Sequence, residues 1–275
     1  MEILPLQSNM MGHLVKVYNQ AVKPIPYCYP VNRDDFAREL EPALGGEASE
    51  DRRDEAVYVA VENRRLAGFV HAAIGPPRPG KDLEEGLIRF LWYRPGMREA
   101  GEKLLDAAEA HCASRGAAAV SVLSQKHRYS FYMMKAAYLS DVLGHVISLL
   151  GMRGYVRNQG EVFLKMPEFT IAEPGPLLDD LPVEVEHTGG RGRLPGVTIR
   201  VAPEEKEIGI CENVSAGEFS RDRLAQEWIF TTWLGVDETY RQLGLGRWLL
   251  QRALWEAQRI GFRHAAISTG WENYR

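Results

Sequence analysis

Apolar residues along this chain recur in two patterns, short runs typical of strands and longer stretches with helical spacing. The clearest helical stretch covers residues 247–260, where one stripe is formed by Leu249, Leu250, Ala253, Leu254, Ala257 and Ile260. A stripe at steps of three and four residues faces a core. Apolar runs at residues 228–236 and 264–269 flank this stretch and are typical of strands. The pattern therefore predicts a strand–helix–strand unit near the end of the chain.

The same order of elements occurs in the first half. A strand is predicted at residues 87–93, a helix from Gly101 to just before Gly116, and a strand at residues 119–123. Gly246 lies 145 residues after Gly101, and Gly261 lies 145 residues after Gly116. The same offset aligns Val236 with Leu91 in the sequence. An internal repeat of this kind predicts two copies of one α/β domain in tandem.

Weaker patterns complete the expected organisation. The first copy is expected to begin with a strand at residues 3–6, helices at 9–22 and near Asn32, and a hairpin at 57–61 and 66–74. A helix at residues 131–150 and a strand at 162–166 would close it. We expect domains at residues 1–167 and 183–275, joined by a linker rich in Pro, Asp and Glu at 168–182. The second copy is expected to lack the two early helices, and also the last helix and strands that the first copy has.

The turn between the second strand and helix is the most informative motif, Arg241-Gln242-Leu243-Gly244-Leu245-Gly246. Glycines let the backbone approach a ligand, and the N–H groups of a helix N-terminus favour an anion. The turn is too short for a phosphate-binding loop and lacks its lysine, and it lacks the glycine spacing of a dinucleotide fold. The alternative is a plain surface turn. In the first copy the same offset places Glu99 opposite Gly244, so a carboxylate would repel a bound pyrophosphate there.

This turn resembles the [RQ]-x-x-G-x-[GA] signature of the GNAT superfamily of N-acetyltransferases, which holds the pyrophosphate of acetyl-CoA. The resemblance is specific over residues 227–273 and looser elsewhere. A tandem pair with a weakened first copy is similar to mycothiol synthase and other bidomain acyltransferases. It implies an α/β (α+β) fold with a mixed sheet in each of two tandem GNAT-like domains. It also implies acetyl transfer from acetyl-CoA to a primary amine of a small molecule or peptide.

By this resemblance, two backbone segments and one asparagine would contact acetyl-CoA. The end of the strand would pair with the pantetheine arm, the turn would hold the pyrophosphate, and the asparagine would lie beside the arm. The residues are Leu234, Gly235, Val236, Arg241, Gln242, Leu243, Gly244, Leu245, Gly246, Arg247 and Asn273. For Asn273, a loop residue in a turn is an equally good interpretation.

The chemistry indicates which further groups to expect. An amine with a pKa of ~10 must lose a proton before it attacks a thioester. Glu227 is the first candidate for the base, with Glu212 and Glu218 as others, and each is also interpretable as a surface carboxylate. The N–H of Val236 is a candidate donor to the oxyanion. Tyr274 is the nearby tyrosine that would protonate the thiolate.

Composition narrows the function classes. A net charge of −4 argues against a surface that coats nucleic acid. The three cysteines have no metal or disulfide spacing, so no metal is expected and a reducing cytoplasm is the expected setting. No run approaches the ~20 apolar residues of a membrane span. The acceptor and the oligomeric state stay open.

Two rival interpretations remain. One is a non-catalytic pseudo-enzyme that binds acyl-CoA or serves as a scaffold, which the missing last helix favours and the intact turn opposes. The other is a FemX-like aminoacyl transferase, also a tandem of this fold, which would need a surface for aminoacyl-tRNA. The acidic balance of the chain disfavours it.

Overall fold

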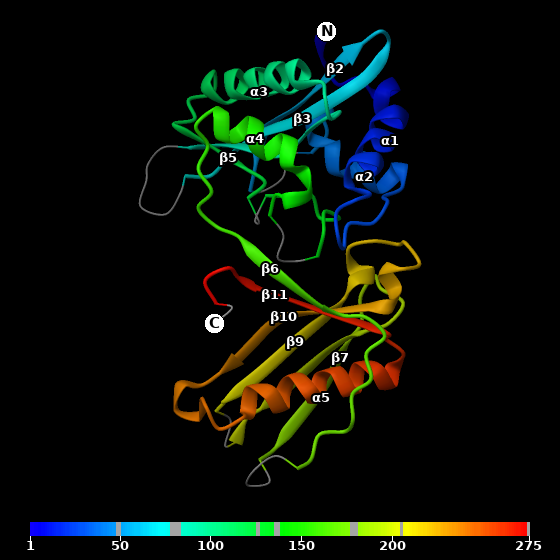
Figure 1. Ribbon diagram of the computed structural model, residues 1–275, viewed down its shortest axis with the longest axis vertical. Helices are drawn as coiled ribbons and strands as arrows, with labels where there is room; N and C mark the ends of the chain where they lie inside the picture. The colour runs from blue at the N-terminus through cyan, green and yellow to red at the C-terminus, as the bar shows by residue number, and fades with distance from the viewer. Residues whose placement is uncertain are drawn as a thin grey trace. The chain divides into compact units, whose positions relative to one another are not determined.

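A computed structural model describes residues 1–47, 51–77, 84–124, 127–134, 138–176, 181–203 and 206–273. The chain divides into two compact units (Figure 1). The first contains residues 1–133 and 137–158, and the second contains residues 134–136 and 159–275. Each unit has one mixed sheet with helices packed on it, which confirms the predicted α/β fold class.

The first sheet has the strand order β1-β2-β3-β4-β5. The strands β1 (Glu2–Pro5), β2 (Arg53–Glu62), β3 (Arg65–Gly75) and β4 (Glu85–Tyr93) are antiparallel, and β5 (Ala119–Val122) is parallel to β4. The predicted hairpin is present as β2 and β3. Its two turn residues, Asn63 and Arg64, both have positive φ, as the tight turn that suits twisted strands requires.

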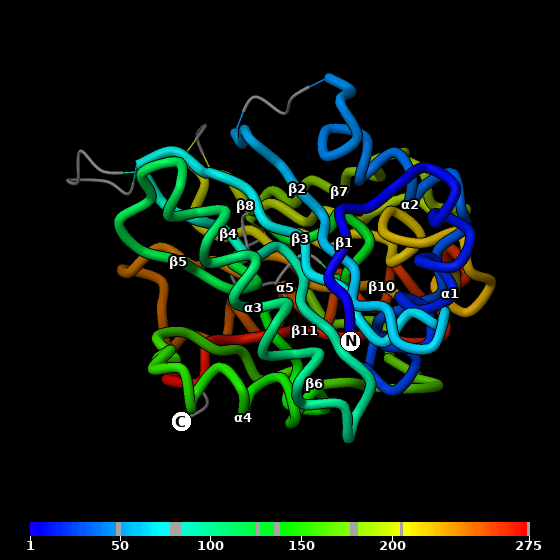
Figure 2. The backbone as a smooth tube through the Cα atoms, turned by 90° about the horizontal axis from the view of Figure 1, so that it is seen from above, coloured from blue at the N-terminus to red at the C-terminus, as the bar shows by residue number. Residues whose placement is uncertain are grey.

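Helices cover both faces of this sheet (Figure 2). On one face lie α1 (Met11–Val22) and α2 (Arg33–Leu40), and on the other lies α3 (Arg98–Ala113) beside α4 (Gly144–Met152). Asn32 caps α2, where its side chain accepts a hydrogen bond from the Asp35 N–H. The helix expected over residues 131–150 begins only at Gly144, because residues 127–134 form buried turns instead.

The second sheet has the order β6-β11-β10-β9-β8-β7. Its strands are β6 (Glu161–Met166), β7 (Val183–Thr188), β8 (Gly196–Val201), β9 (Gly209–Ser215), β10 (Trp228–Val236) and β11 (His264–Gly270). The helix α5 (Leu245–Ile260) buries its apolar stripe on this sheet, with Leu249 and Ala257 fully buried. Only residues 189–195 connect β7 to β8, so the two early helices of the first copy have no counterpart there, as expected.

The strand β6 belongs to the second sheet, so the prediction that it closes the first copy is wrong. It pairs antiparallel with β11, from Met166 opposite Ala265 to Glu161 opposite Gly270. The Phe163 ring stacks on Phe230 of β10, with centroids 5.9 Å apart. Pairing joins strands that are distant in sequence, and the order of elements along the chain carries no signal for it. The second compact unit therefore begins near residue 159, before the expected boundary at 167, and β11 has an outer neighbour that was expected to be missing.

The elements of the two copies correspond, but the helices and the strands do so at different offsets. The buried residues of α3 and α5 match at the predicted offset of 145 residues, for example Leu104 with Leu249. The strands correspond at an offset of 143 residues, because β4 ends at Tyr93 and β10 ends at Val236. Val236 therefore corresponds to Tyr93 and not to Leu91, and the second turn is two residues longer than the first.

Candidate functional site

The strands β10 and β11 diverge halfway along their length (Figure 1). They pair only from Trp228 with His264 to Thr231 with Ile267, and beyond this point β10 pairs only with β9 and β11 only with β6. A β-bulge at Thr232 marks the point of divergence. Bulges bend a strand and redirect its backbone groups, and they are common next to functional sites.

Backbone groups of β10 face this opening. The Asp237 N–H donates to the Ile208 carbonyl at 2.9 Å, so the groups of Gly235, two residues earlier, also point toward β9. The backbone N–H and carbonyl groups of Leu234 and Val236 point away from β9, toward the opening. The Val236 carbonyl there accepts a hydrogen bond from Arg241 Nε at 3.2 Å. Of the three residues predicted to pair with a ligand arm, Leu234 and Val236 thus have the required orientation and Gly235 does not.

The predicted anion-binding turn lies at the end of β10. Gly244 is the N-cap of α5 with φ of 86°, a left-handed conformation that favours glycine. Neither a side-chain cap nor an acidic residue is present in the first turn. The Leu245, Gly246 and Arg247 N–H groups precede the first intrahelical bond, which Trp248 donates to Gly244. A Cβ at Gly244 would meet nothing within 4 Å. This helix end therefore fits an anion such as a pyrophosphate.

In the first copy, side chains of the protein itself lie at the corresponding positions. Helix α3 has Glu99 in its first turn, 2.8 Å from Lys103 Nζ. The carbonyl of Tyr93, which corresponds to Val236, lies 2.9 Å from His145 Nε2, and the Tyr93 hydroxyl donates to the His145 carbonyl. A Cβ at Gly101 would lie 2.4 Å from the Tyr93 ring, so this glycine makes room for a side chain of the protein itself.

The carboxylates considered as bases lie in three different settings. Glu227 precedes β10, four residues or roughly 13 Å before Thr231, and lies 3.7 Å from Arg263 and His264. Glu218 accepts the backbone N–H groups of residues 191 and 192, so it holds a loop. Only Glu212 lies at the divergence point, opposite Trp233 and next to the bulge.

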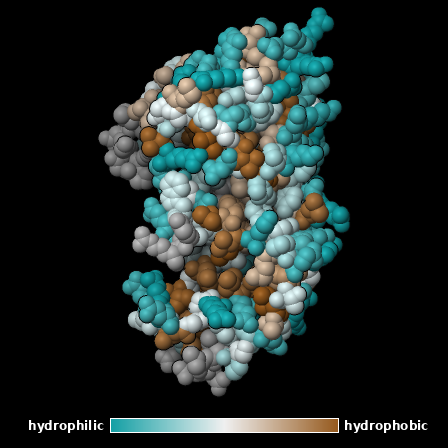
Figure 3. Space-filling view, in the orientation of Figure 1, coloured by the Kyte–Doolittle hydropathy of each residue, from teal (hydrophilic) through white to brown (hydrophobic). Residues whose placement is uncertain are grey.

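Two further predicted residues, Asn273 and Tyr274, follow β11 in the sequence. Asn273 follows the C-terminal end of β11, where its N–H donates to the Gly270 carbonyl at 2.8 Å. Tyr274 lies outside the described residues. Apolar side chains gather on the surface above α5, over β6, β11 and β10 (Figure 3). Leu164 and Met166 of β6 are exposed.

The first unit contains a buried polar cluster that was not predicted from the sequence, because its members come from separate elements. Arg89, the bulge residue of β4, is 1% exposed. Its guanidinium pairs with Glu55 at 3.0 Å and with Glu39, and it donates to the His127 carbonyl at 2.9 Å. His71 lies 2.8 Å from Glu55 and 3.1 Å from the Tyr129 hydroxyl. The cluster thus fastens the buried turns at residues 127–134 to the sheet.

Burial and pairing set the charges of this cluster. Burial lowers the pKa of His71 to about 4, although the neighbouring Glu55 opposes the shift. Burial would raise the pKa of Glu55, but His71 and Arg89 lower it to about 2. Near neutral pH the cluster therefore holds an ionised Glu55, a charged Arg89 and a neutral His71.

Among the described residues, no helix is long and apolar enough to cross a membrane. Within the same residues, no group of three or more His, Cys, Asp or Glu side chains is placed to hold a metal ion.

Comparison with known proteins identifies the fold. Residues 23–136 match the model of the Acetyltransferase (GNAT) family. The chain is similar over 99% of its length to a tandem GNAT protein from the clavulanic acid biosynthesis pathway, at 12% identity and a TM-score of 0.65, covering 91% of that chain. It is also similar to a GCN5-related N-acetyltransferase from Sphaerobacter thermophilus, with 11% identity and a TM-score of 0.57 over 99% of this chain and 87% of that one.

A third similar structure is the GCN5-related glucosamine N-acetyltransferase region of a fungal multi-domain GH3 β-N-acetylglucosaminidase. The identity is 14% and the TM-score 0.66, and the match covers 98% of this chain but only 37% of the fungal chain. No curated protein matches the chain. These likenesses confirm the predicted tandem GNAT fold. The family match covers the first copy, whereas the signature turn lies in the second.

Proposed function

We propose that this protein is an N-acetyltransferase that moves the acetyl group of acetyl-CoA to a primary amine of a small molecule or peptide. The second unit would bind acetyl-CoA. One observation carries this proposal: the uncapped N-terminus of α5 with its left-handed Gly244 adjoins the opening between β10 and β11. In the first copy, Glu99 lies in the first turn of the matching helix and His145 engages the matching carbonyl of Tyr93, so the first unit would serve as a partner domain with a degenerate turn.

Different residues of the second unit would bind different parts of acetyl-CoA. The backbone N–H groups from Gln242 to Arg247, with the Arg241 side chain, would hold the pyrophosphate. Leu234 and Val236 would pair with the pantetheine arm as an added strand does. Asn273 would lie beside the arm on the β11 side.

The bound thioester supplies an activated acyl group, and residues of the chain would handle the protons. Glu212 would accept a proton from the acceptor amine, directly or through a water molecule. Leu234 is nearer the bulge than Val236, so we assign the Leu234 N–H as the hydrogen-bond donor to the acyl oxygen. Glu227 lies at the paired end of β10, and we assign it a supporting role in place of the base. The proton donor to the thiolate stays with Tyr274 as a prediction.

Calorimetric titration of acetyl-CoA into the purified chain tests the proposal. We expect one equivalent to bind, and Gly244→Glu to abolish binding because it places a carboxylate in the cradle. The matched control is Gly96→Glu, since Gly96 also has a positive φ and open space around it, in the turn before α3. Loss of binding in the control alone would move the site to the first unit.

A measurement of acetyl transfer distinguishes the enzyme from a protein that only binds acyl-CoA. Binding followed by acetyl transfer in a screen of amines would support the enzyme. Binding with no transfer to any amine would support the alternative, a non-catalytic protein that binds acyl-CoA. No binding at all would contradict both.

A further inference from the structure

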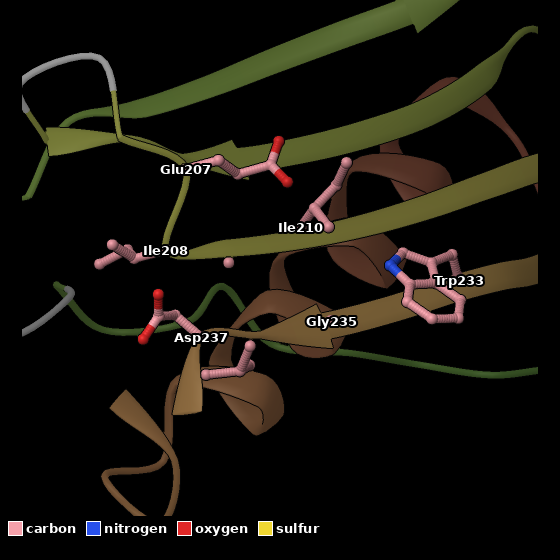
Figure 4. Close-up of a pocket in the computed structure, with 8 residues that line it drawn as sticks. Glu207, Ile208, Ile210, Trp233, Gly235 and Asp237 are labelled. Carbon is pink, nitrogen blue, oxygen red and sulfur yellow. The ribbon is translucent and has the colours of Figure 1, made fainter. Parts of the chain in front are cut away.

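A cavity of about 210 Å³ lies on the second sheet. Figure 4 shows the side chains of Trp233, Ile210 and Glu207 on the near side of β9 and β10, with α5 behind the strands. The Trp233 indole is 60% exposed, an unusual state for so large an aromatic group on a sheet. Its Nε1 lies 2.8 Å from the position that a Cβ of Gly235 would take, so the ring lies over this glycine. The cavity thus has an accessible aromatic wall.

The same position in the first copy is part of the core. Phe69 and Phe90 correspond to Ile210 and Trp233 in the strand register, and their stacked rings are fully buried. They pack beneath Tyr18 of α1 and Phe36 of α2. The second copy has only residues 189–195, all of them described, where those helices would begin. The cavity is therefore a core position of the fold that the second copy leaves open.

Negative charge surrounds this apolar wall. Glu184 and Glu186 on β7 and Glu212 on β9 share the face, since their neighbours Val185 and Cys211 pack toward α5. The other two carboxylates, Glu207 and Asp237, line the cavity. Hydrogen bonds from Thr239, together with Lys206, lower the pKa of Asp237 to about 2, so it is ionised at neutral pH.

Among the described residues of this face, Arg200 and Lys206 only partly balance the five carboxylates. Arg200 lies 3.4 Å from Glu207 and 4.0 Å from Glu186. Lys206 lies 3.2 Å from Asp237. The face therefore keeps an excess of negative charge, and Glu186 and Glu212, two strand spacings or roughly 10 Å apart, stand on either side of Thr198. Separated carboxylates around an indole are complementary to several cationic groups joined by apolar segments.

We propose that this cavity binds a polyamine, a chain of ammonium groups separated by short alkyl segments, as the acetyl acceptor. The inference rests on the proposed function. Alkyl segments would pack on Trp233, one ammonium group would lie over its ring, and others would pair with the carboxylates. A terminal amine would reach the opening across Gly235, where β10 has no side chain on this face.

In the transfer step, the acceptor ammonium first loses one proton to Glu212, which releases it to solvent. The neutral nitrogen then forms a bond to the acetyl carbon as the carbon–sulfur bond breaks, and the bonding electron pair leaves with the sulfur of CoA. The second nitrogen proton passes to Glu212, while Tyr274, the predicted donor, protonates the thiolate and regains its proton through solvent. The product amide carries no charge at that nitrogen, so its attraction to the acidic face is weakened.

Spermidine titration followed by calorimetry and tryptophan fluorescence tests the site. We expect Trp233→Ala to weaken spermidine binding at least tenfold, and Glu186→Gln to weaken it about threefold. Trp255→Ala is the matched control, because Trp255 lies on α5 between the guanidinium groups of Arg252 and Arg259. It should leave spermidine affinity unchanged, and circular dichroism should show all variants folded.

The outcomes separate this inference from the proposed function. Gly244→Glu should lose acetyl-CoA and keep spermidine, whereas Trp233→Ala should keep acetyl-CoA. Equal spermidine affinity in the wild type and Trp233→Ala, or 1-aminobutane binding as tightly as spermidine, would overturn the polyamine site. Acetyl-CoA binding without spermidine binding would remove this inference alone. Spermidine binding without acetyl-CoA binding would leave the cavity assigned but remove its role as acceptor site.

Discussion

Two glycines of the signature turn have different physical roles. Gly244 has φ of 86°, which costs a residue with a Cβ about 1–2 kcal/mol. Gly246 lies within α5, and its Cβ would make only ordinary contact, 3.5 Å from Val236. Alanine there would even favour the helix by about 0.5–1 kcal/mol. The second glycine is therefore unnecessary for folding, and the proposed approach of acetyl-CoA to the backbone would account for it.

The first prediction separates stability from binding at these positions. We expect Gly244→Ala to lower the free energy of unfolding of the second unit by about 1–2 kcal/mol. Gly246→Ala should leave it equal or slightly higher, yet weaken acetyl-CoA binding about tenfold, a loss of about 1.4 kcal/mol. Urea unfolding and calorimetry measure the two quantities. Full acetyl-CoA affinity in Gly246→Ala would contradict the close backbone approach.

Glu212 and Glu227 give a second residue-scale prediction. Glu212→Gln should lower kcat about 10²–10⁴-fold and flatten the dependence of rate on pH, because the general base is removed. Acetyl-CoA affinity should stay unchanged. Glu227→Gln is the control at the other end of β10, with an expected change of less than threefold. The reverse ranking of the two variants would place the base at Glu227.

At the scale of single elements, β6 is the main departure from expectation. Phe163 stacks on Phe230 of β10, whereas the next residue, Leu164, is 55% exposed. We expect Phe163→Ala to lower the stability of the second unit by about 2–4 kcal/mol and Leu164→Ala by less than about 1 kcal/mol. Thermal unfolding with and without acetyl-CoA identifies the unit affected, since a ligand stabilises only the unit that binds it. Destabilisation of the first unit by Phe163→Ala would contradict the pairing of β6 with β11.

Elements with local signals were predictable from the sequence. Helix α5, its closing Gly261 with φ of 112°, and the hairpin at Asn63 follow from spacing and turn chemistry that neighbouring residues carry. The partner of β6 and the cluster around Arg89 were not predictable, because their contacts join residues far apart in the chain. Within the site, the sequence identified the turn, but only the strand register showed that Gly235 faces β9 and that Glu212 lies at the bulge.

At the scale of the whole chain, the two copies use the same sheet positions differently. The first copy covers one face with α1 and α2, packs Phe69 and Phe90 beneath them, and fills its β4 bulge with Arg89. The second copy leaves the matching face open, with Trp233 exposed. The first copy is therefore closed on this face, whereas the second is open there and has no acidic residue in the first turn of its helix.

This division predicts different pH responses for the two units. His71 of the first unit has a pKa lowered from 6.5 to about 4, so only the unfolded chain takes up its proton between these values. The first unit should lose about 1–3 kcal/mol of stability as the pH falls from 7 to 4.5. Glu55, with a pKa lowered from 4.5 to about 2, extends the loss below pH 4.5.

Urea unfolding at several pH values measures this response. Acetyl-CoA identifies the transition of the second unit, because only that transition should shift to higher urea when the ligand is added. We expect His71→Gln to lower the stability of the first unit at pH 7 and to remove most of its decline between pH 6.5 and 4.5. The slope carries the argument, since the loss of a merely structural histidine would lower both ends of the curve equally. An unchanged slope in His71→Gln would show that the pH response of the first unit arises outside the cluster that fastens residues 127–134 to the sheet.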